Sequence, residues 1–206
     1  ILLGIPTGVL AAVKRGTFWD YIARGVAIIG QGAPPFVIGL LLIVIFAVWL
    51  QDTPFELPAA GRPPQFNIKT YILPCIALGW PAAAGLMRLT RSAMLEVLDS
   101  EFVKLARAKG VGWNKVIYKH ALKNALITPL TSALLLFSGW LNGALVIEII
   151  FGWPGIGYDA LFTAVNDNDF PLLQGTVFFF VIIFVIFALL ADLLYTIIDP
   201  RVRLTG

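Results

Sequence analysis

The sequence predicts an all-α, polytopic membrane protein, a bundle of helices inserted in a bilayer. Three observations predict it: an apolar share of 59%, a charged share of only 13%, and a mean hydropathy of +0.87. Soluble domains are about half apolar and about one quarter charged, so a soluble fold could not hide this much apolar surface. The 206 residues are therefore interpreted as a single transmembrane domain, counted in helices of about 20 apolar residues.

Five apolar segments follow one another along the chain. The first is too short to span a bilayer alone, and it opens at Ile1 without a charged leader. We therefore expect a chain that is truncated inside its first helix, and not a signal peptide. The expected spans are 1–13 (partial), 26–50, 71–89, 125–147 and 172–198.

Lysine and arginine are distributed unevenly between the segments that connect these spans. Thirteen of the fifteen basic residues lie in 14–25, in or at the edge of the long segment 90–124, or in the C-terminal tail. The connecting segments 51–70 and 151–171 hold the other two. Because cytoplasmic loops of membrane proteins are enriched in Lys and Arg, we expect the three basic regions, the C-terminus included, in the cytoplasm and the other two outside.

Prolines and glycines inside the apolar segments predict kinked and closely packed helices. Membrane helices tolerate proline where neighbouring helices or a cavity satisfy the freed backbone groups. Gly4 and Gly8 form a GxxxG pattern, which lets two helix backbones approach closely. The prolines are Pro34, Pro35, Pro74 and Pro81.

The basic segment 90–124 is patterned like packed helix. Asp99 or Ser100 can cap a helix that begins at Glu101, and Gly110 supplies a left-handed stop at its end. An apolar edge beside small residues would let this helix seat closely against a partner protein. The alternative is an amphipathic helix on anionic lipid headgroups, and composition alone does not decide between them. The edge is formed by Phe102, Leu105, Ala106, Val111 and Trp113, and the small residues are Ala106, Ala108 and Gly110.

This segment resembles the cytoplasmic loop motif of permeases of binding-protein-dependent ABC importers, and more closely the dipeptide/oligopeptide permease family. The motif is carried by EFVKLARAKG at 101–110, followed by KHALKNALI at 119–127. Two further stretches agree, EIIFGWPGIG at 148–157 and DLLYTIIDPR at 192–201. The resemblance covers nearly the whole chain, although the family's first helix and the external segment after it are absent.

The sequence departs from the general importer motif in two places. That motif begins Glu-Ala-Ala, whereas Lys104, Leu105 and Ala106 stand here. Its later Leu-Pro is Leu122-Lys123. Both departures look typical of the peptide branch, so they favour that branch within the superfamily.

The resemblance implies the type I ABC importer permease fold and a subunit that translocates peptides or similar small solutes by alternating access. The helix in the basic segment would sit in a cleft of a cytoplasmic ATPase and transmit its closure to the spans. The implied partners are a second homologous permease, two cytoplasmic ATPase subunits, an extracytoplasmic solute-binding protein and the lipid of a bacterial or archaeal cytoplasmic (inner) membrane. The residues expected to couple to the ATPase are Glu101, Phe102, Leu105, Ala106, Arg107, Ala108, Lys109, Gly110 and Trp113.

Patterns for catalysis, metal binding and nucleotide binding are missing from the sequence. Without a GxxxxGK[ST] phosphate loop, we expect no catalytic residue and no cofactor in this chain, and ATP-Mg on the partner ATPase subunits. His120 is the only histidine and has no Cys or carboxylate at ligand spacing, so no metal site is expected. The basic residues follow topology, so nucleic-acid binding is not expected either.

Polar residues in the fourth apolar segment, 125–147, lie on one helix face. Thr128, Thr131, Ser138 and Asn142 follow helical spacing. Such a face can line a solute pathway or form hydrogen bonds between helices. We assign Ser138 and Asn142 to the substrate pathway, and Thr128 and Thr131 to interhelical hydrogen bonds.

Ionisable residues at membrane depth are expensive and indicate function by default. Glu148 stands at the end of that segment, beside a Trp-Pro-Gly turn, and we expect it to hold an outer gate in a structural role. Asp192 is expected to cap a helix or pair with a nearby base. The outer-gate residues are Glu148, Trp153, Pro154, Gly155 and Gly157.

Two other functions remain open at this point. A self-sufficient secondary transporter or channel would explain the hydrophobicity and topology, but gives no reason for a long, helix-rich cytoplasmic loop. A structural membrane subunit would use the polar face of 125–147 only to hold helices together. The sequence does not identify the transported solute.

Overall fold

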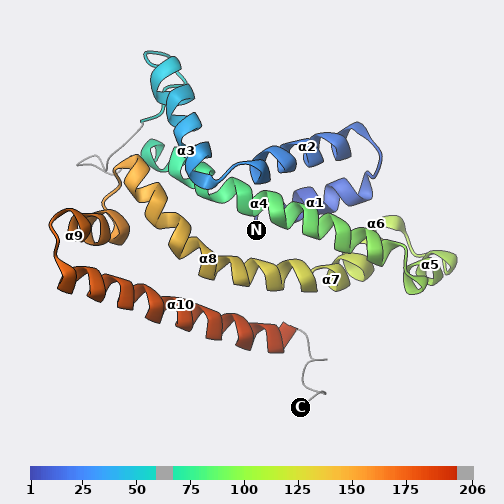
Figure 1. The fold of residues 1–206 in the computed structure, drawn as a ribbon. Helices are drawn as coiled ribbons and strands as arrows, with labels where there is room; N and C mark the ends of the chain where they lie inside the picture. The colour runs from blue at the N-terminus through green and yellow to red at the C-terminus, as the bar shows by residue number, and fades with distance from the viewer. Residues whose placement is uncertain (59–66, 199–206) are drawn as a thin grey trace. The chain divides into compact units, whose positions relative to one another are not determined.

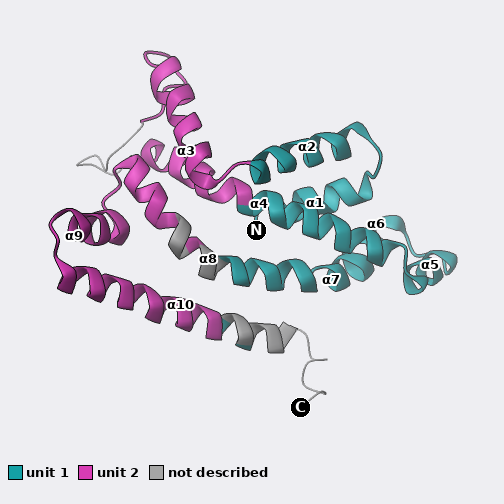
Figure 2. Ribbon diagram, viewed as in Figure 1, with its two compact units in different colours: residues 1–32, 82–136, 190–206 teal, residues 33–81, 137–189 magenta. Residues whose placement is uncertain are grey.

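The computed structural model describes residues 1–58 and 67–198, leaving out the side chains of 137–139, 141–143, 191, 192 and 194–198. These described residues form helices and turns, and no strand occurs among them, so the fold is all-α as predicted (Figure 1). The chain divides into two compact units (Figure 2). Unit 1 comprises Ile1–Gly32, Ala82–Leu136 and Leu190–Gly206, and unit 2 comprises Ala33–Pro81 and Phe137–Leu189.

Unit 1 is built around α1 and the second half of α4, with the short helices of the basic segment packed on them. Its elements are α1 (Gly4–Val13), α2 (Phe18–Gly32), α5 (Glu101–Ala108), α6 (Trp113–Lys115), the π-helix η2 (Val116–Ala121) and α7 (Leu122–Ala125), with parts of α4 (Lys69–Leu98) and α8 (Ile127–Phe151). Its buried core consists of Val9, Ala12, Met94, Ile117, Ala121 and Ala125.

Helix α1 lies directly against α4 because it has glycine at two positions on one face. A Cβ atom on Gly4 would lie 2.6 Å from the carbonyl oxygen of Ala83, and one on Gly8 would lie 2.6 Å from that of Met87. A backbone carbonyl in a helix cannot move aside as a flexible side chain can. The GxxxG pattern is therefore a packing motif, as its spacing predicted.

Unit 2 contains α3 and the segments on either side of the turn after α8. Its elements are α3 (Pro35–Ile43), the π-helices η1 (Val44–Trp49) and η3 (Ile156–Phe162), α9 (Thr163–Asn166) and most of α10 (Phe170–Ile198), together with the first part of α4 and the last part of α8. Its buried core consists of Ile38, Leu42, Leu73, Ala77, Ile147 and Phe151.

The predicted span 26–50 is divided between two helices. Helix α2 ends at Gly32, and α3 begins at Pro35 with Pro34 in an extended conformation before it (φ −59°, ψ 149°). Proline disfavours helix at the preceding residue but is well suited to the first position of a helix. Two consecutive prolines therefore end one helix and start the next inside the predicted span 26–50. Pro74 and Pro81, in contrast, lie inside α4, which continues through both.

Two helices of the described chain are each long and apolar enough to cross a membrane, Lys69–Leu98 and the part Phe170–Leu190 of α10. The number rises to four if each of two broken helix pairs counts as one span. Helix α4 extends to Leu98, well into the segment that the sequence predicted as a loop. The shorter helices Gly4–Val13 and Ile127–Leu136 are also apolar.

Candidate functional site

Helix α5 is anchored to unit 1 by one apolar residue. Val103 is completely buried, and α5 packs against η2. Phe102 and Leu105 remain 46% and 57% exposed, although both are large and apolar. Val103 was not predicted from the sequence, because nothing in the local pattern distinguishes the anchoring face of α5 from the exposed one.

The N-terminus of α5 is not capped as predicted. Ser100 occupies the N-cap position, but its hydroxyl donates a hydrogen bond to the carbonyl oxygen of Val97 at 2.5 Å and does not accept one from the first turn. The carboxylate of Asp99 lies 3.9 Å from a guanidinium nitrogen of Arg15. Within the helix, the Lys104 ammonium group donates a hydrogen bond to Glu101 at 2.8 Å, which raises the pKa of Lys104.

The C-terminus of α5 ends in a left-handed turn, as the sequence predicted. Gly110 has a φ of +77°. Its amide donates to the carbonyl oxygen of Arg107 at 2.9 Å, and the amide of Val111 donates to that of Ala106 at 3.2 Å. These two bonds form a Schellman motif, which satisfies carbonyl groups that the helix end leaves free. A Cβ on Gly110 would meet no atom within 4 Å, so only the backbone conformation requires glycine here.

An exposed surface runs from α5 to the start of α6. The guanidinium carbon of Arg107 lies 5.1 Å from the centre of the Trp113 ring, within reach of a cation–π interaction. Trp113 is 43% exposed. Ala106 is half-buried, and Ala108, Lys109 and Gly110 are exposed. We call this the α5 surface, and define it as Phe102, Leu105, Ala106, Arg107 and Trp113, which are five of the nine predicted coupling residues.

A second Schellman motif ends helix α8. Gly152 has a φ of +56°, and its amide donates to the carbonyl oxygen of Ile149 at 3.3 Å. The amide of Trp153 donates to the carbonyl oxygen of Glu148 at 2.8 Å. The role of Gly152 was not predicted from the sequence, although a glycine that follows a long apolar run is a recognised helix-stop signal.

The turn after α8 is organised around the Glu148 side chain. One carboxylate oxygen of Glu148 accepts hydrogen bonds from the amides of Gly157 at 2.8 Å and Tyr158 at 3.2 Å. These amides belong to the first turn of η3, where backbone donors lack partners within the helix. A Cβ on Gly155 would lie within 2.6 Å of both carboxylate oxygens, and one on Gly157 would lie 2.9 Å from the bonded oxygen. The two glycines thus make room for the carboxylate.

The other predicted residues of this outer turn lie beside it. The Trp153 ring packs on the Tyr71 ring, with centroids 4.6 Å apart, and Pro154 is half-buried between Trp153 and Gly155. The helix segments Ala144–Phe151 and Ile156–Asn166 are bent by 84° at this turn. The structure therefore gathers Glu148, its two glycines and Trp153 into one tightly connected turn.

The polar face of α8 includes Thr131, which is half-buried. Its hydroxyl donates to the carbonyl oxygen of Ile127 at 2.9 Å, so the proton of this hydroxyl stays inside the same helix. Thr128 is exposed. Ser138 and Asn142 lie within α8, but their side chains are outside the described residues, as is that of Asp192.

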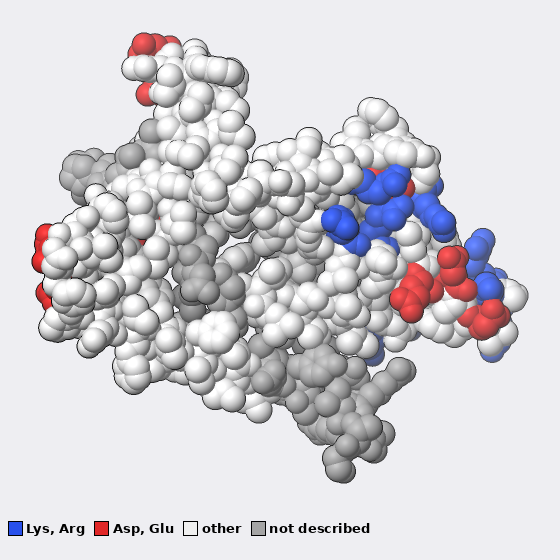
Figure 3. Space-filling view, viewed as in Figure 1, with Lys and Arg blue, Asp and Glu red and all other residues white. Residues whose placement is uncertain are grey.

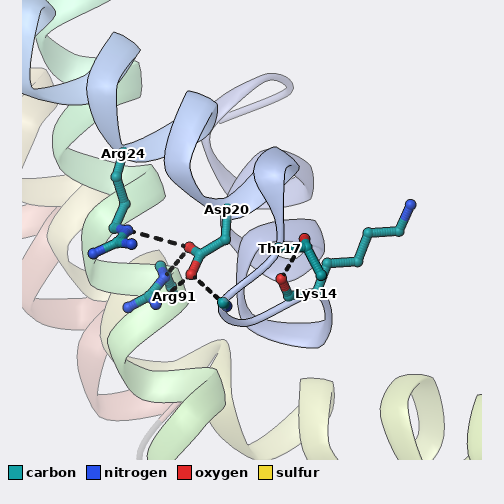
Figure 4. A network of polar contacts seen from close by, with 6 residues as sticks. Lys14, Thr17, Asp20, Arg24 and Arg91 are labelled. Atoms are coloured by element: carbon teal, nitrogen blue, oxygen red, sulfur yellow. Dashed lines mark hydrogen bonds and ion pairs between the residues drawn. The ribbon is translucent and has the colours of Figure 1, made fainter.

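A charged network in unit 1 joins the turn between α1 and α2 to helix α4 (Figure 4). The carboxylate of Asp20 is 1% exposed and accepts two hydrogen bonds from Arg91, at 2.7 and 2.9 Å. The carboxylate also accepts a hydrogen bond from the amide of Gly16 at 3.0 Å, and its Oδ1 lies 3.4 Å from Nε of Arg24. The role of Asp20 was not predicted from the sequence, although Asp20 is the single acidic residue in the otherwise basic segment 14–25.

The charged side chains of unit 1 gather over the ends of α2 and α4 and around α5 on the face drawn in Figure 3. All four ion pairs among the described residues belong to this unit. They are Arg15–Asp99, Arg24–Asp20, Arg91–Asp20 and Lys104–Glu101. In the described part of the chain, no group of three or more His, Cys, Asp or Glu residues lies together as metal ligands would.

An all-α fold with apolar helices of spanning length defines a membrane component, and the exposed α5 and the Glu148 turn agree with the motifs quoted above. The chain belongs to the family of binding-protein-dependent transport system inner membrane components, whose family model matches residues 4–204. This shows the family that the resemblance had indicated.

Named relatives fall in the peptide branch of this family. The chain is 40% identical to the dipeptide transport system permease protein of Alkalihalophilus pseudofirmus, with 98% of this chain and 67% of that protein covered. It is 39% identical to the dipeptide permease protein of Bacillus subtilis (99% and 64%) and 38% identical to the oligopeptide permease protein of Salmonella typhimurium (98% and 64%). The chain thus spans about two thirds of the length of these relatives.

A solved structure supports the fold. The crystal structure of an amino acid ABC transporter with histidines superposes with a TM-score of 0.69, at 15% sequence identity, and the match covers 94% of this chain and 85% of that one. At this identity the likeness concerns the fold alone.

Proposed function

We propose that this chain is the transmembrane permease subunit of an ABC importer that carries peptides or similar small solutes across the cytoplasmic membrane by alternating access. The observation that carries the proposal is the exposed α5 surface on a helix that Val103 anchors to the rest of unit 1. The chain belongs to a family of inner membrane transport components, which supports the same function. The printed names of the relatives, dipeptide and oligopeptide permease proteins, support the solute class.

The α5 surface is the proposed contact with an ATPase subunit that binds ATP-Mg. Phe102 and Leu105 leave apolar area in water that a cleft on a partner would cover. The small residues Ala106 and Ala108 allow a close approach, and Glu101, Arg107 and Lys109 lie around this contact and can pair with charges on its rim. The left-handed turn at Gly110 sets the direction in which the chain leaves α5 toward Trp113.

The remaining partners follow from the same proposal. A second homologous permease would complete the pathway, two ATPase subunits would bind at the cytoplasmic side, and an extracytoplasmic binding protein would deliver the solute. The basic segments 14–25 and 90–124 and the C-terminus face the cytoplasm in this arrangement. Ser138 and Asn142 of α8 are the proposed pathway residues, and the Glu148 turn is the proposed outer gate.

The test of the function is purification of the complex from cells that express the neighbouring subunits. We expect the ATPase subunits to co-purify with this chain, and reconstituted vesicles to take up peptide only with ATP and loaded binding protein. A self-sufficient transporter or channel would instead move solute without ATP. A purely structural subunit would leave solute selectivity unchanged when Asn142 is replaced.

The orientation predicts a labelling pattern in a Cys75→Ala background, which is needed because Cys75 is exposed. A cysteine at Asn168, an exposed position between α9 and α10, should react in intact cells with a thiol reagent that cannot cross membranes. A cysteine at Gly112, also exposed, should react only after the membrane is opened. Labelling of position 112 but not position 168 in intact cells would invert the proposed topology.

A further inference from the structure

Asp20 is the only acidic or basic residue that is buried in the described part of the chain. A buried charge is unfavourable unless it is paired and hydrogen-bonded. Asp20 meets this condition through Arg91, Gly16 and Arg24 (Figure 4). Replacing such a pair with apolar residues often leaves stability unchanged or improved, so stability alone does not account for this network.

The pair between Asp20 and Arg91 has a fixed geometry. Two nitrogens of the Arg91 guanidinium, Nε and Nη2, donate to the two carboxylate oxygens. This bidentate arrangement holds both distance and orientation, which a lysine in place of arginine could not do. Because the carboxylate is buried, pulling the partners apart would leave an uncompensated charge. The pair therefore resists gradual stretching and keeps its two helices in register.

The pair connects the helix that leads into α5 with the helix that follows α1. Arg91 lies on α4 about two helical turns before its end at Leu98, and only Asp99 and Ser100 separate that end from α5. Asp20 lies in the first turn of α2 and also holds the Gly16 amide in the turn between α1 and α2, where Gly16 has a φ of +76°. A displacement of α5 that moves the end of α4 would thus be carried to α2.

We propose that Asp20 is a positioning residue for energy coupling: through its pair with Arg91, it transmits movement of α5 and the end of α4 to α2. This inference rests on the proposed function, in which α5 contacts the ATPase. In this proposal α2 and α4 must move together, and the pair links them. Loss of the pair should therefore uncouple ATP hydrolysis from solute movement, while the α5 surface stays in place.

The chain provides a matched control for this pair. Arg15 and Asp99 also join the turn after α1 to the end of α4, but their nitrogen and oxygen lie 3.9 Å apart and their side chains are 65% and 77% exposed. Exposed ion pairs contribute little because water and salt screen them. The Arg15→Gln variant therefore removes a cation from the same turn without disturbing the buried pair.

The experiment uses the full complex with its ATPase subunits and binding protein, reconstituted in proteoliposomes with a peptide mixture as solute. The variants are Arg91→Lys, Asp20→Asn and the double variant Asp20→Asn/Arg91→Gln, which removes both charges and leaves two amides that can still hydrogen-bond. ATPase pull-down measures assembly, and solute taken up per ATP hydrolysed measures coupling.

We expect the Arg91→Lys variant and the double variant to retain the ATPase subunits but to lose at least about fivefold in uptake per ATP, the lower end of typical coupling between sites. Arg15→Gln should stay at the wild-type ratio. If Asp20→Asn alone fails to assemble, the other two variants decide. Arg91→Lys keeps both charges of the buried pair, and the double variant removes both, so that only the partly exposed Arg24 guanidinium loses its partner.

A wild-type ratio of uptake to hydrolysis in both the Arg91→Lys and double variants would overturn the inference. So would a loss of uptake that only follows a loss of assembled complex. These outcomes are distinct from failure of the proposed function, in which the wild-type chain itself would neither bind the ATPase subunits nor support ATP-dependent uptake, and the inference would fall with it.

Discussion

Replacing Gly110 with valine is expected to abolish ATP-driven uptake while the permease still inserts in the membrane. Gly110 has a φ of +77°, a conformation that costs a β-branched residue about 1–3 kcal/mol. Relief of this strain would break the turn that directs Val111 and Trp113, although a Cβ at position 110 meets no neighbouring atom. Uptake, ATPase pull-down and ligand-stimulated ATP hydrolysis measure the effect.

Gly112→Val is the matched control for this change. Gly112 lies two residues further along the same loop, also has open space around it, and has a φ of −59° and a ψ of 142° that valine adopts readily. We expect this variant to retain most of its ATPase binding. Equal loss in both valine variants would mean that side-chain bulk, and not the left-handed turn, disturbs the loop.

Ala106→Asp tests the same surface without altering the backbone. Ala106 is half-buried on α5, and in the proposed contact a carboxylate there would lose its water without gaining a partner, which costs several kcal/mol unless it is neutralised. We expect the ATPase to dissociate in detergent, or to hydrolyse ATP without a response to loaded binding protein. Full binding and stimulation in both Ala106→Asp and Gly110→Val would show that α5 is not the coupling element.

The second large effect is expected at the outer turn, where Glu148→Leu should reduce uptake strongly. The change leaves the amides of Gly157 and Tyr158 without their acceptor, at a cost of about 1–3 kcal/mol for each buried donor left unpaired. Glu148→Gln keeps one acceptor oxygen without the charge, and should lose less because bonds to charged groups are stronger. Uptake and thermal unfolding of the purified complex measure the series.

Gly155→Ala should reproduce part of the Glu148→Leu effect from the opposite side of the contact. Its Cβ would lie within 2.6 Å of both carboxylate oxygens, so the Glu148 side chain must move away from the amides that it binds. Gly175→Ala is the control, because a Cβ at that position in α10 meets nothing within 4 Å. Wild-type uptake in Gly155→Ala and Glu148→Leu would remove this turn from the proposed gate, whereas loss of ATPase binding would indicate a general failure to fold.

The sequence by itself determined the features whose causes are local. A left-handed stop at Gly110 follows from the position of a glycine after a helical pattern, and the structure has it. Close packing of the first helix against another helix follows from glycines four residues apart, although the spacing does not say that α4 is the partner. The all-α membrane class follows from composition, since a soluble fold could not bury apolar surface on this scale.

Local patterns were insufficient where two partners compete for one group. Ser100 lies at the N-cap position as predicted, but its hydroxyl bonds backward to Val97. Serine and threonine side chains have several backbone acceptors within reach, and the sequence does not rank them. The same competition places the Thr131 hydrogen bond inside α8.

Only the tertiary structure decided which distant residues meet. Asp20 and Arg91 are 71 positions apart, and the sequence offers Asp20 several closer bases. Val103 is the anchor of α5 because η2 packs on the face that holds it. Phe102 and Leu105 lie outside that contact and stay exposed. Spacing along one helix fixes which residues share a face, but the choice of the face that is buried depends on where the other helices pack, and that is set by the fold as a whole.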